Sequence, residues 1–287
     1  MATKRELEAR TKSIQKTKQI VRTMELIARN RLMKVKDKAL VGRPYSEKIN
    51  EILSSVQMRL KEASHPLLEK QDRFENFCLI LFSSDRGLCG AFNNNIFENA
   101  QRFIDAKKDK KAKVIIVGQK GIHYFRRKNF DIIDTYEELE KGKELQISLD
   151  IKDKIIELYK KKEIGEVYLM FNKFKQQLIG EVVIKKLLPF EITCEEKEEK
   201  RKVLVEHLYE PSYTEVLDKL IPQYIMNQIY QGALESRAQE EMARMLAMKQ
   251  AADSADEMLG DLRLQYHKLR QSLITKEIIE VVSGGQT

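Results

Sequence analysis

The sequence predicts a protein of class α/β plus long α, in which an antiparallel coiled coil of the N- and C-terminal helices carries an inserted small α/β (Rossmann-like) domain. Three observations predict this fold. Both ends of the chain are long and almost free of helix breakers, apolar residues recur every seven positions at both ends, and short apolar runs alternate with amphipathic segments in between. We expect a long N-terminal helix in residues 1–64, an α/β domain in residues 65–210 and a long C-terminal helix in residues 211–287.

The composition is that of a folded, basic protein. The chain has 287 residues and a formal net charge of +8, with 33% charged and 42% hydrophobic residues, which excludes both a disordered tail and an integral membrane protein. The first ten residues lack the apolar stretch of a secretory signal, and Glu6 and Glu8 argue against a transit peptide. Cys78, Cys89 and Cys194 are odd in number and far apart, so we expect reduced, packed cysteines.

The N-terminal helix is predicted by an unbroken apolar periodicity. Neither Gly nor Pro occurs in residues 1–41. Apolar residues fall every seven positions, and others flank that line: first Leu7, Ile14, Val21, Ala28 and Val35, then Ile20, Met24, Ile27 and Leu32. Proline inside a helix removes a hydrogen bond and clashes with the preceding turn. We therefore expect a kink or break at Gly42-Arg43-Pro44 and an end at His65-Pro66.

The C-terminal segment contains no proline after Pro222 and shows two heptad tracks. The first track is Leu217, Tyr224, Gln231, Ala238, Met245, Ala252, Leu259, Tyr266 and Leu273, and the second is Leu220, Asn227, Leu234, Glu241, Met248, Ala255, Leu262 and Leu269. A repeat sustained over so many heptads is typical of a coiled coil. An apolar stripe this narrow requires a partner helix, because helix propensity alone contributes little stability in water.

The charges of the two ends indicate that they are each other's partner. Residues 1–43 hold 13 basic and 4 acidic side chains, whereas residues 211–287 hold 8 basic and 11 acidic ones. Opposite charges beside two apolar seams favour pairing, and the domain between the helices allows them to run antiparallel.

The middle of the chain predicts a small α/β domain. Apolar runs at residues 78–82, 114–117, 132–133, 167–171 and 182–188 are expected to be strands, and residues 93–106, 121–128 and 147–161 are expected to be helices. Continuous apolar strands that alternate with helices favour a mostly parallel sheet. The run at residues 195–202 is expected to be a charged surface excursion.

The motifs of common α/β enzymes are absent. The sequence contains no phosphate-binding P-loop, no dinucleotide fingerprint and no nucleophile elbow. The four histidines, His65, His123, His207 and His267, lack the spacing of metal ligands. We therefore expect no catalytic residues, no cofactor and no metal.

The segment of residues 83–90 has two interpretations. It either binds an anion at the start of the next helix, with help from Arg86, or it is a tight turn. In the turn, Gly87 and Gly90 supply positive φ angles and Asp85 caps the helix. We favour the turn, because two glycines alone lack the spacing of a phosphate fingerprint.

The basic N-terminal helix has three interpretations, namely a nucleic-acid module, a membrane-surface helix and a shaft facing an acidic protein surface. Residues 1–42 contain no aromatic side chain to read bases or anchor in a membrane. The third interpretation is therefore favoured. An α/β enzyme with a coiled-coil appendage remains the alternative for the whole chain.

Three blocks of sequence carry a family resemblance. They are SIQKTKQI at residues 13–20 with MELIA at 24–28, SDRGLCG at residues 84–90, and ESRAQEEMARMLAMK at residues 235–249 with ITKEIIE at 274–280. These blocks resemble the γ subunits of F-type ATP synthases, and the resemblance covers the whole chain in order. The length and the lack of a transit-peptide pattern point to a bacterial form, with a mature mitochondrial chain, which has lost its presequence, as the alternative.

The resemblance implies a function and a set of partners. In that family the paired end helices form a shaft inside a ring of three α and three β subunits, and the α/β domain is a foot that contacts the ε subunit and the membrane-embedded c-ring. The shaft is not catalytic, and its rotation couples proton or sodium flow to ATP synthesis or hydrolysis at the β sites. We therefore expect a peripheral protein on the cytoplasmic face of a bacterial membrane, without bilayer insertion and without nucleic acid as a partner.

The resemblance also implies interface residues. The contacts with β correspond to Met24, Arg244, Arg270, Gln271, Thr275 and Glu277, and the apolar tip corresponds to Ile278, Ile279, Val281 and Val282. Charge alone adds a basic shaft surface of Arg29, Arg31, Lys34 and Lys36. A tip held by dispersion contacts would act as a bearing, because such contacts lack the directionality of hydrogen bonds.

Overall fold

A computed structural model describes residues 3–57, 66–67, 76–137, 139, 142–175, 180–190 and 213–284. The chain forms two compact units. The helical unit consists of Met1–Asn30 and Arg244–Thr287, and the α/β unit consists of Arg31–Ala243. Two long helices, α1 (Lys4–Gln57) and α5 (Tyr213–Gly284), contribute residues to both units.

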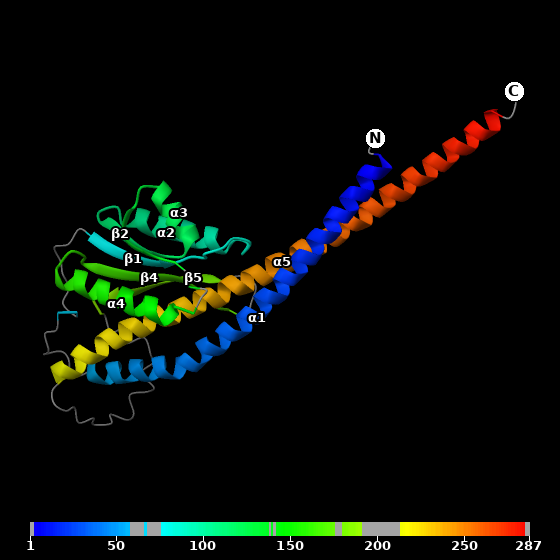
Figure 1. Ribbon diagram of the computed structural model, residues 1–287. Helices are drawn as coiled ribbons and strands as arrows, with labels where there is room; N and C mark the ends of the chain where they lie inside the picture. Colours follow the sequence, from blue (N-terminus) through cyan, green and yellow to red (C-terminus); the bar gives the residue numbers. More distant parts are fainter. Residues whose placement is uncertain are drawn as a thin grey trace. The chain divides into compact units, whose positions relative to one another are not determined.

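The α/β unit is built on a five-stranded sheet (Figure 1). Its strands are β1 (Asn76–Phe82), β2 (Lys111–Val117), β3 (Asp131–Tyr136), β4 (Glu166–Lys173) and β5 (Glu181–Leu188), in the spatial order β3-β2-β1-β4-β5. All neighbouring pairs are parallel except β4 with β5, which is antiparallel. The predicted five strands and the mostly parallel sheet are therefore confirmed.

Helices cover both faces of this sheet. The helices α2 (Phe92–Ala106) and α3 (Gln119–Arg127) pack on one face, and α4 (Glu144–Lys160) packs on the other. Successive side chains of the central strand β1 point to opposite faces, so that Leu79 and Leu81 join the core with α2 and α3 while Ile80 and Phe82 join the core with α4. A strand buried on both faces is apolar throughout, which explains the continuous run that predicted it.

The first part of α5 also covers the sheet. Leu217, Ile221, Ile225 and Ile229 recur every four residues and lie fully buried in the same core as α4. Gly232 allows the close approach, since a Cβ atom there would lie 3.2 Å from the side chain of Leu169 on β4. This stretch of the predicted coiled-coil helix is thus one wall of the α/β core.

Of the kink or break expected at Gly42-Arg43-Pro44, the break is wrong, because α1 continues without interruption through Pro44. Ala39 and Ile49 are buried on either side of the proline, so packing holds the helix in place. At Gly42 the helix approaches α5 so closely that a Cβ atom would lie 2.0 Å from the side-chain amide of Gln231. Of the second predicted stop, Pro66 lies in a turn and His65 lies outside the described residues, as do Cys194 and the charged run at 195–202.

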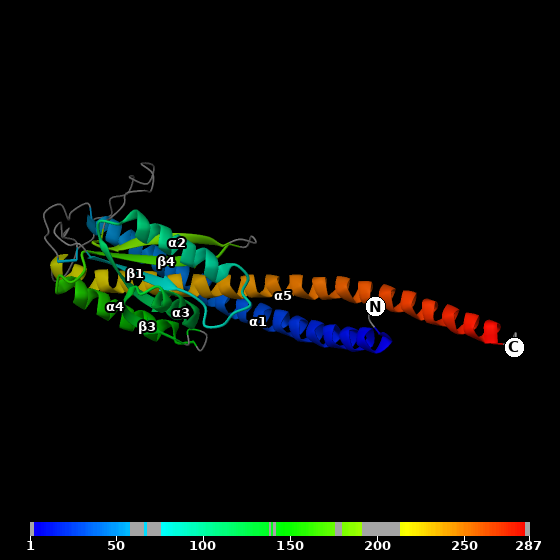
Figure 2. The same ribbon diagram turned by 90° about the horizontal axis from the view of Figure 1, so that it is seen from above.

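In the helical unit, α1 and α5 pair antiparallel (Figure 2). As the residue numbers along α1 increase, the numbers of the α5 residues that they contact decrease. The hydroxyl of Tyr266 donates a hydrogen bond to Glu8 at 3.2 Å, and Lys18 and Arg22 both bind the carboxylate of Asp256. The predicted antiparallel coiled coil is confirmed in this unit.

The seam of the coiled coil follows the predicted tracks only in part. Leu7 and Ala28 on α1, and Ala252, Leu259 and Leu262 on α5, are buried as predicted. Ile20 and Ile27 were expected beside the seam, but they are 60% and 47% exposed. The second column on α1 is instead formed by half-buried Thr11, Lys18 and Glu25.

The segment of residues 83–90 is a turn closed by its own hydrogen bonds. Asn93 accepts a hydrogen bond from the backbone N–H of Ser84 and donates to the Ser84 hydroxyl. Positive φ occurs at Gly90, as predicted, but at Leu88 instead of Gly87. Asp85 caps α3 instead of α2, because its carboxylate accepts from the backbone N–H of Gln119 at 3.2 Å.

The two cysteines that the structure describes, Cys78 and Cys89, are free and buried, in agreement with the prediction of reduced, packed thiols. Burial raises the pKa of the Cys78 thiol to about 12, an effect that nearby Lys113 only partly offsets. This thiol therefore stays protonated, unreactive and part of the core.

A cluster of charges ties α2 to the edge of β4. Glu166 accepts a hydrogen bond from Lys107 at 3.0 Å and lies 3.1 Å from Lys110, while Lys107 also donates to the hydroxyl of Tyr168. The ammonium of Lys107 lies 4.4 Å from the centroid of the Tyr168 ring. Burial raises the pKa of Glu166, but the hydrogen bonds and charges of the two lysines outweigh it and lower the pKa to about 2.

The Glu166 cluster predicts an acid-dependent loss of stability. Because the folded pKa of about 2 lies below the reference value of 4.5, the cluster stabilises the fold fully above pH 4.5 and loses this effect as the pH falls toward 2. We expect Glu166→Gln to lower the free energy of unfolding by about 1–2 kcal/mol at pH 7, since partial exposure screens the pair. Urea titrations should show a smaller difference in the free energy of unfolding between the parent chain and Glu166→Gln at pH 2.5 than at pH 7. Glu163→Gln, at an exposed neighbouring site, is the control, and an equal Glu166→Gln effect at both pH values would contradict this assignment.

Candidate functional site

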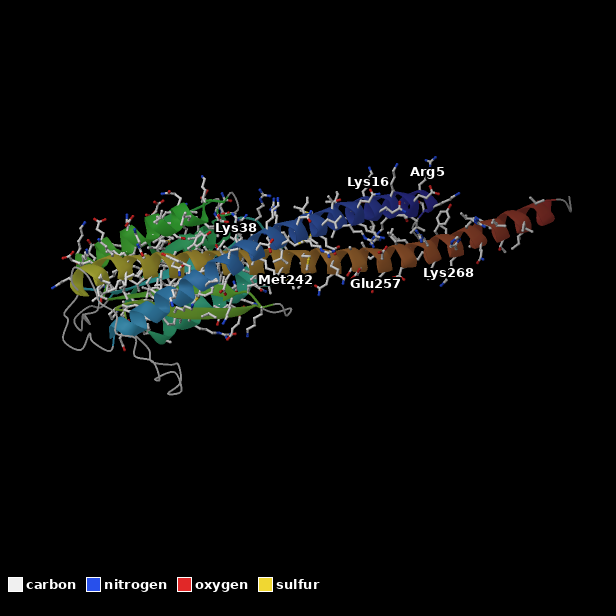
Figure 3. All side chains as sticks on the ribbon, turned by 90° about the horizontal axis from the view of Figure 1, so that it is seen from below. Arg5, Lys16, Lys38, Met242, Glu257 and Lys268 are labelled. Atoms are coloured by element: carbon white, nitrogen blue, oxygen red, sulfur yellow. The ribbon has the colours of Figure 1, made fainter. Side chains whose placement is uncertain are left out.

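The strongest candidate for a functional surface in the helical unit is the exterior of its two helices. Arg5 and Lys16 lie on the side of α1 that faces away from α5, and Glu257 and Lys268 lie on the outer side of α5 (Figure 3). These four side chains are exposed. The excess basic charge of α1 is therefore presented at the surface of the pair, where it attracts acidic partners.

Part of the basic charge is neutralised across the seam. Asp256 binds Lys18 and lies 3.3 Å from Arg22, and the hydrogen bond from Lys18 is the main reason why the pKa of Asp256 is below its usual value. The opposite charges that predicted the pairing thus meet at this point. Arg22 remains more than half exposed and keeps donors for a further acceptor.

The end of α5 exposes a row of large apolar side chains. In the helical unit α5 continues past the start of α1 (Figures 1 and 2). Leu273, Ile274, Ile278, Ile279 and Val281 are between 40% and 75% exposed. Contiguous exposed apolar surface marks a protein interaction site, because water contact with such side chains is unfavourable.

Three of the residues predicted to contact a partner lie just before this apolar end or within it. Arg270, Gln271 and Thr275 are all exposed on α5, and Thr275 follows Gln271 by one helical turn, which places both on the same face. The hydroxyl of Thr275 donates to the backbone carbonyl of Gln271 at 2.9 Å, which leaves its oxygen able to accept a hydrogen bond. Glu277 and Val282 belong to the same helix, but their side chains lie outside the described set.

The other two predicted contact residues of the helical unit differ in exposure. Met24 is half-buried on α1, whereas Arg244 on α5 is buried and is already engaged in interactions within the chain. Arg29, from the predicted basic surface, is exposed. The structure therefore leaves Met24 and Arg29 more accessible than Arg244.

The remaining basic residues belong to the α/β unit. Lys34 is exposed and Lys36 is half-buried on α1. Arg31 lies 3.5 Å from the carboxylate of Glu241, a fully buried residue of α5 that interrupts the heptad track. An unpaired charge at such a position would be costly, so Arg31 serves the coiled coil as well as its surface.

The exposure of several apolar residues on α1 was not predicted. Ile20, Leu26 and Ile27 of the helical unit are large, apolar and about half exposed. A coiled-coil seam buries only two columns of side chains, and α1 has more apolar residues than two columns can hold. This excess of apolar residues could have predicted that some of them are exposed. They add exposed apolar side chains to α1 that a partner could cover.

Two kinds of feature are absent among the described residues. Among them, no three His, Cys, Asp or Glu side chains are grouped so that a metal ion could be held. Within those same ranges, every helix is too short or too polar to cross a membrane. The arrangement of charged and apolar surface instead favours binding to other proteins.

Comparison with known proteins identifies the family. The family model described as ATP synthase matches residues 3–287. The ATP synthase gamma chain of Pelotomaculum thermopropionicum is 38% identical, with 99% of both chains covered, and that of Chloroherpeton thalassium is 34% identical over 99% of this chain and 98% of its own length.

Solved structures share the fold. A chain of the Euglena gracilis mitochondrial ATP synthase, OSCP/F1/c-ring in rotational state 3, matches with a TM-score of 0.69 at 16% identity, covering 99% of this chain and 93% of that chain. A chain of the Tetrahymena thermophila mitochondrial ATP synthase central stalk and c-ring matches with a TM-score of 0.57 at 20% identity, covering 81% and 99%. With a family model that spans nearly every residue and full-length gamma chains as relatives, this chain belongs to the ATP synthase family.

Proposed function

We propose that this protein is the central-stalk rotor subunit of an F-type ATP synthase. In this proposal the paired end helices turn inside a ring of three α and three β subunits, and ion flow through the membrane c-ring drives the rotation that leads to ATP synthesis. Hydrolysis at the β sites drives the rotation in reverse. The chain itself supplies no catalytic residue, and the division into residues 1–64, 65–210 and 211–287 follows the two helices and the foot of the stalk.

The observation that carries the proposal is the exposed apolar end of α5 beside a basic two-helix surface. Such a surface is unfavourable in water and requires an enclosing partner of complementary charge. The full-length relatives are gamma chains, and the similar folds come from the stalk and F1/c-ring assemblies of ATP synthases. An enclosing ring of subunits satisfies both the apolar and the basic surface.

We assign the contacts with the β subunits to Met24, Arg244, Arg270, Gln271, Thr275 and Glu277. Ile278, Ile279, Val281 and Val282 form the apolar tip, which sits in an apolar sleeve of the ring, and Arg29, Arg31, Lys34 and Lys36 face acidic loops of the ring. Each β subunit would meet a different side of the shaft, and differential contacts of this kind are what shift the affinity of remote sites.

The α/β unit would contact the ε subunit and the c-ring, which holds the protein on the cytoplasmic face of a bacterial membrane as a peripheral subunit. Coupling then requires that torque passes from this unit into α5. The burial of Leu217, Ile221, Ile225 and Ile229 against the sheet supports such a connection, because a packed core resists deformation.

Reconstitution tests the proposal directly. The full chain is mixed with α and β subunits from the same source, and the assembly is isolated and imaged while it hydrolyses ATP. We expect one copy of this chain for three copies each of α and β, and rotation of a label attached to the foot. Turnover of nucleotide by the purified chain alone would contradict the non-catalytic assignment, and tight, salt-dependent DNA binding would favour a nucleic-acid module.

Substitution of a predicted contact gives a quantitative test. Arg270→Gln removes a charge from exposed α5, and we expect it to lower the rate of ATP-driven rotation at least about fivefold, the lower end of typical coupling energies. Lys268→Gln removes the same charge from an exposed position two residues earlier and should change the rate less than about twofold. Equal rates for both variants would remove Arg270 from the interface.

A further inference from the structure

A small pocket lies where the strand order of the sheet reverses. From β1 the chain passes through α2 to β2 and β3 on one side, and through α4 it returns to β4 on the other side of β1. In open α/β sheets, the crevice outside the carboxyl ends of two such strands is the usual position of a ligand. The pocket is lined from the end of β4 by Asn172, from the start of α2 by Phe92 and Asn95, and from α5 by Gln239 and Ala243.

The size of the pocket limits its occupant. Its volume is about 100 Å³, the space of about three water molecules. Sites for nucleotides and other drug-sized ligands begin at roughly 300 Å³. Any occupant is therefore a small molecule or ion of a few atoms.

Two buried side chains in the lining have polar atoms without a partner among the described residues. The Nδ2 of Asn172 is an unused donor and the Oε1 of Gln239 is an unused acceptor, in side chains that are 2% and 3% exposed. Gly180, which also lines the pocket, leaves room for Gln239, since a Cβ atom there would lie 2.5 Å from the Gln239 side chain. A buried polar atom left unpaired costs about 1–3 kcal/mol, so both atoms require an occupant.

The start of α2 adds a preference for negative charge. Phe92 is its first residue, and the residue before it, Ala91, makes no side-chain capping hydrogen bond. No acidic residue occupies the first turn of this 15-residue helix. The amino terminus of a helix carries a partial positive charge and binds anions.

We infer that this pocket binds a small protonated oxyanion, with hydrogenphosphate as its occupant. The phosphate oxygens accept from Asn172 Nδ2 and face the start of α2, while the P–OH group donates to Gln239 Oε1. Water satisfies the two amides but not the charge preference, and a fully deprotonated anion leaves Gln239 without a donor. The inference does not depend on the proposed rotor function, because the site lies within the α/β unit.

The test measures the binding of inorganic phosphate to the full chain at neutral pH, by ³¹P NMR titration and by calorimetry. Saturable binding of phosphate to one site is expected. Sulfate has the same shape but carries no proton at this pH, so it should bind at least about tenfold more weakly, the effect of one lost hydrogen bond. Bicarbonate also carries a proton, so its affinity must be compared with that of phosphate. If bicarbonate bound more tightly than phosphate, hydrogenphosphate would not be the occupant.

Variants identify the site. Asn172→Asp puts a carboxylate in the pocket and should weaken phosphate binding at least about tenfold. Gln239→Leu keeps the approximate size, removes the acceptor and should bring phosphate down to the affinity of sulfate, which provides a second measurement if Asn172→Asp fails to fold. Asn129→Asp makes the same chemical change at an exposed position between α3 and β3, away from the first turn of α2, and should bind within about twofold of the parent chain.

Three results would overturn the inference. They are the absence of saturable phosphate binding, equal affinities for phosphate and sulfate, and unchanged phosphate binding in both pocket variants. The first would leave only ordered water in the pocket.

Discussion

Replacement of Arg237 by alanine is expected to lower the free energy of unfolding of the α/β unit by about 3–5 kcal/mol, the usual cost of removing one partner from a buried ion pair. Arg237 on α5 pairs with Glu144, the first residue of α4. Their side chains are only 11% and 3% exposed. Without the guanidinium, the Glu144 carboxylate would remain buried beside an empty space.

The pair joins two helices that share one face of the sheet. Ser148 donates a hydrogen bond to the backbone carbonyl of Glu144, and Ile147 and Ile151 of α4 lie in the same core as the first part of α5. In the proposed rotor, torque from the foot passes into α5 across this contact. Arg237→Ala should therefore also reduce the yield of ATP made per ion transported in the reconstituted complex.

A double-mutant cycle separates the pair from the packing around it. Arg237→Met combined with Glu144→Leu replaces both charges with apolar groups and should recover most of the lost stability in urea unfolding. Lys161→Ala breaks an exposed ion pair with Glu157 at the far end of α4 and should leave the urea midpoint unchanged. If Arg237→Ala behaved like Lys161→Ala, the buried pair would not contribute to stability.

The second large effect is expected at Gly118, the residue between β2 and α3. Its φ angle is +101°, and a Cβ atom would lie 2.2 Å from the backbone carbonyl oxygen of Ser83. Backbone cannot move aside as a side chain does, and Gly118 is also fixed by a hydrogen bond from its N–H to Tyr136 at 2.8 Å. We expect Gly118→Ala to cost at least about 3 kcal/mol through strain and steric overlap together.

Gly142→Ala is the matched control for Gly118→Ala. Gly142 also has a positive φ of +81°, but the nearest atom to a Cβ there is a Glu144 oxygen at 3.9 Å. This variant should therefore cost only the strain of the left-handed conformation, about 1 kcal/mol. Similar midpoints of thermal unfolding for the two variants would show that close approach to Ser83 adds nothing.

The strands and short helices could be predicted because the apolar pattern of each segment is enough to indicate its secondary structure. The run at residues 78–82 is apolar at every position, a pattern that is typical of a short strand buried on both faces. The heptad spacing of Ala252, Leu259 and Leu262 likewise predicted the seam of α5 correctly. Local patterns failed at Pro44, where packing outweighs one lost hydrogen bond, and at Ile20 and Ile27, which an apolar pattern alone cannot distinguish from seam residues.

The candidate surface was predicted unevenly for the same reason. Arg270, Gln271 and Thr275 were identified through a family resemblance, and their exposure is consistent with that role. The partner of Glu241 and the exposed side chains of α1 required the structure, because the contacts of Arg31 and the exposure of Leu26 depend on how α1 packs against α5.

The secondary-structure elements, the antiparallel pairing of two oppositely charged ends and the family of this protein could all be inferred from the amino-acid sequence. Periodicity and charge are properties of a single segment, so they can be read without knowledge of the segment's neighbours. The three-dimensional packing was needed to show that the first part of α5 covers the sheet, that Arg237 pairs with Glu144, and that Asn172 and Gln239 line one pocket. These contacts join residues far apart in the chain, and a pattern of burial indicates that a residue has a partner without indicating which one.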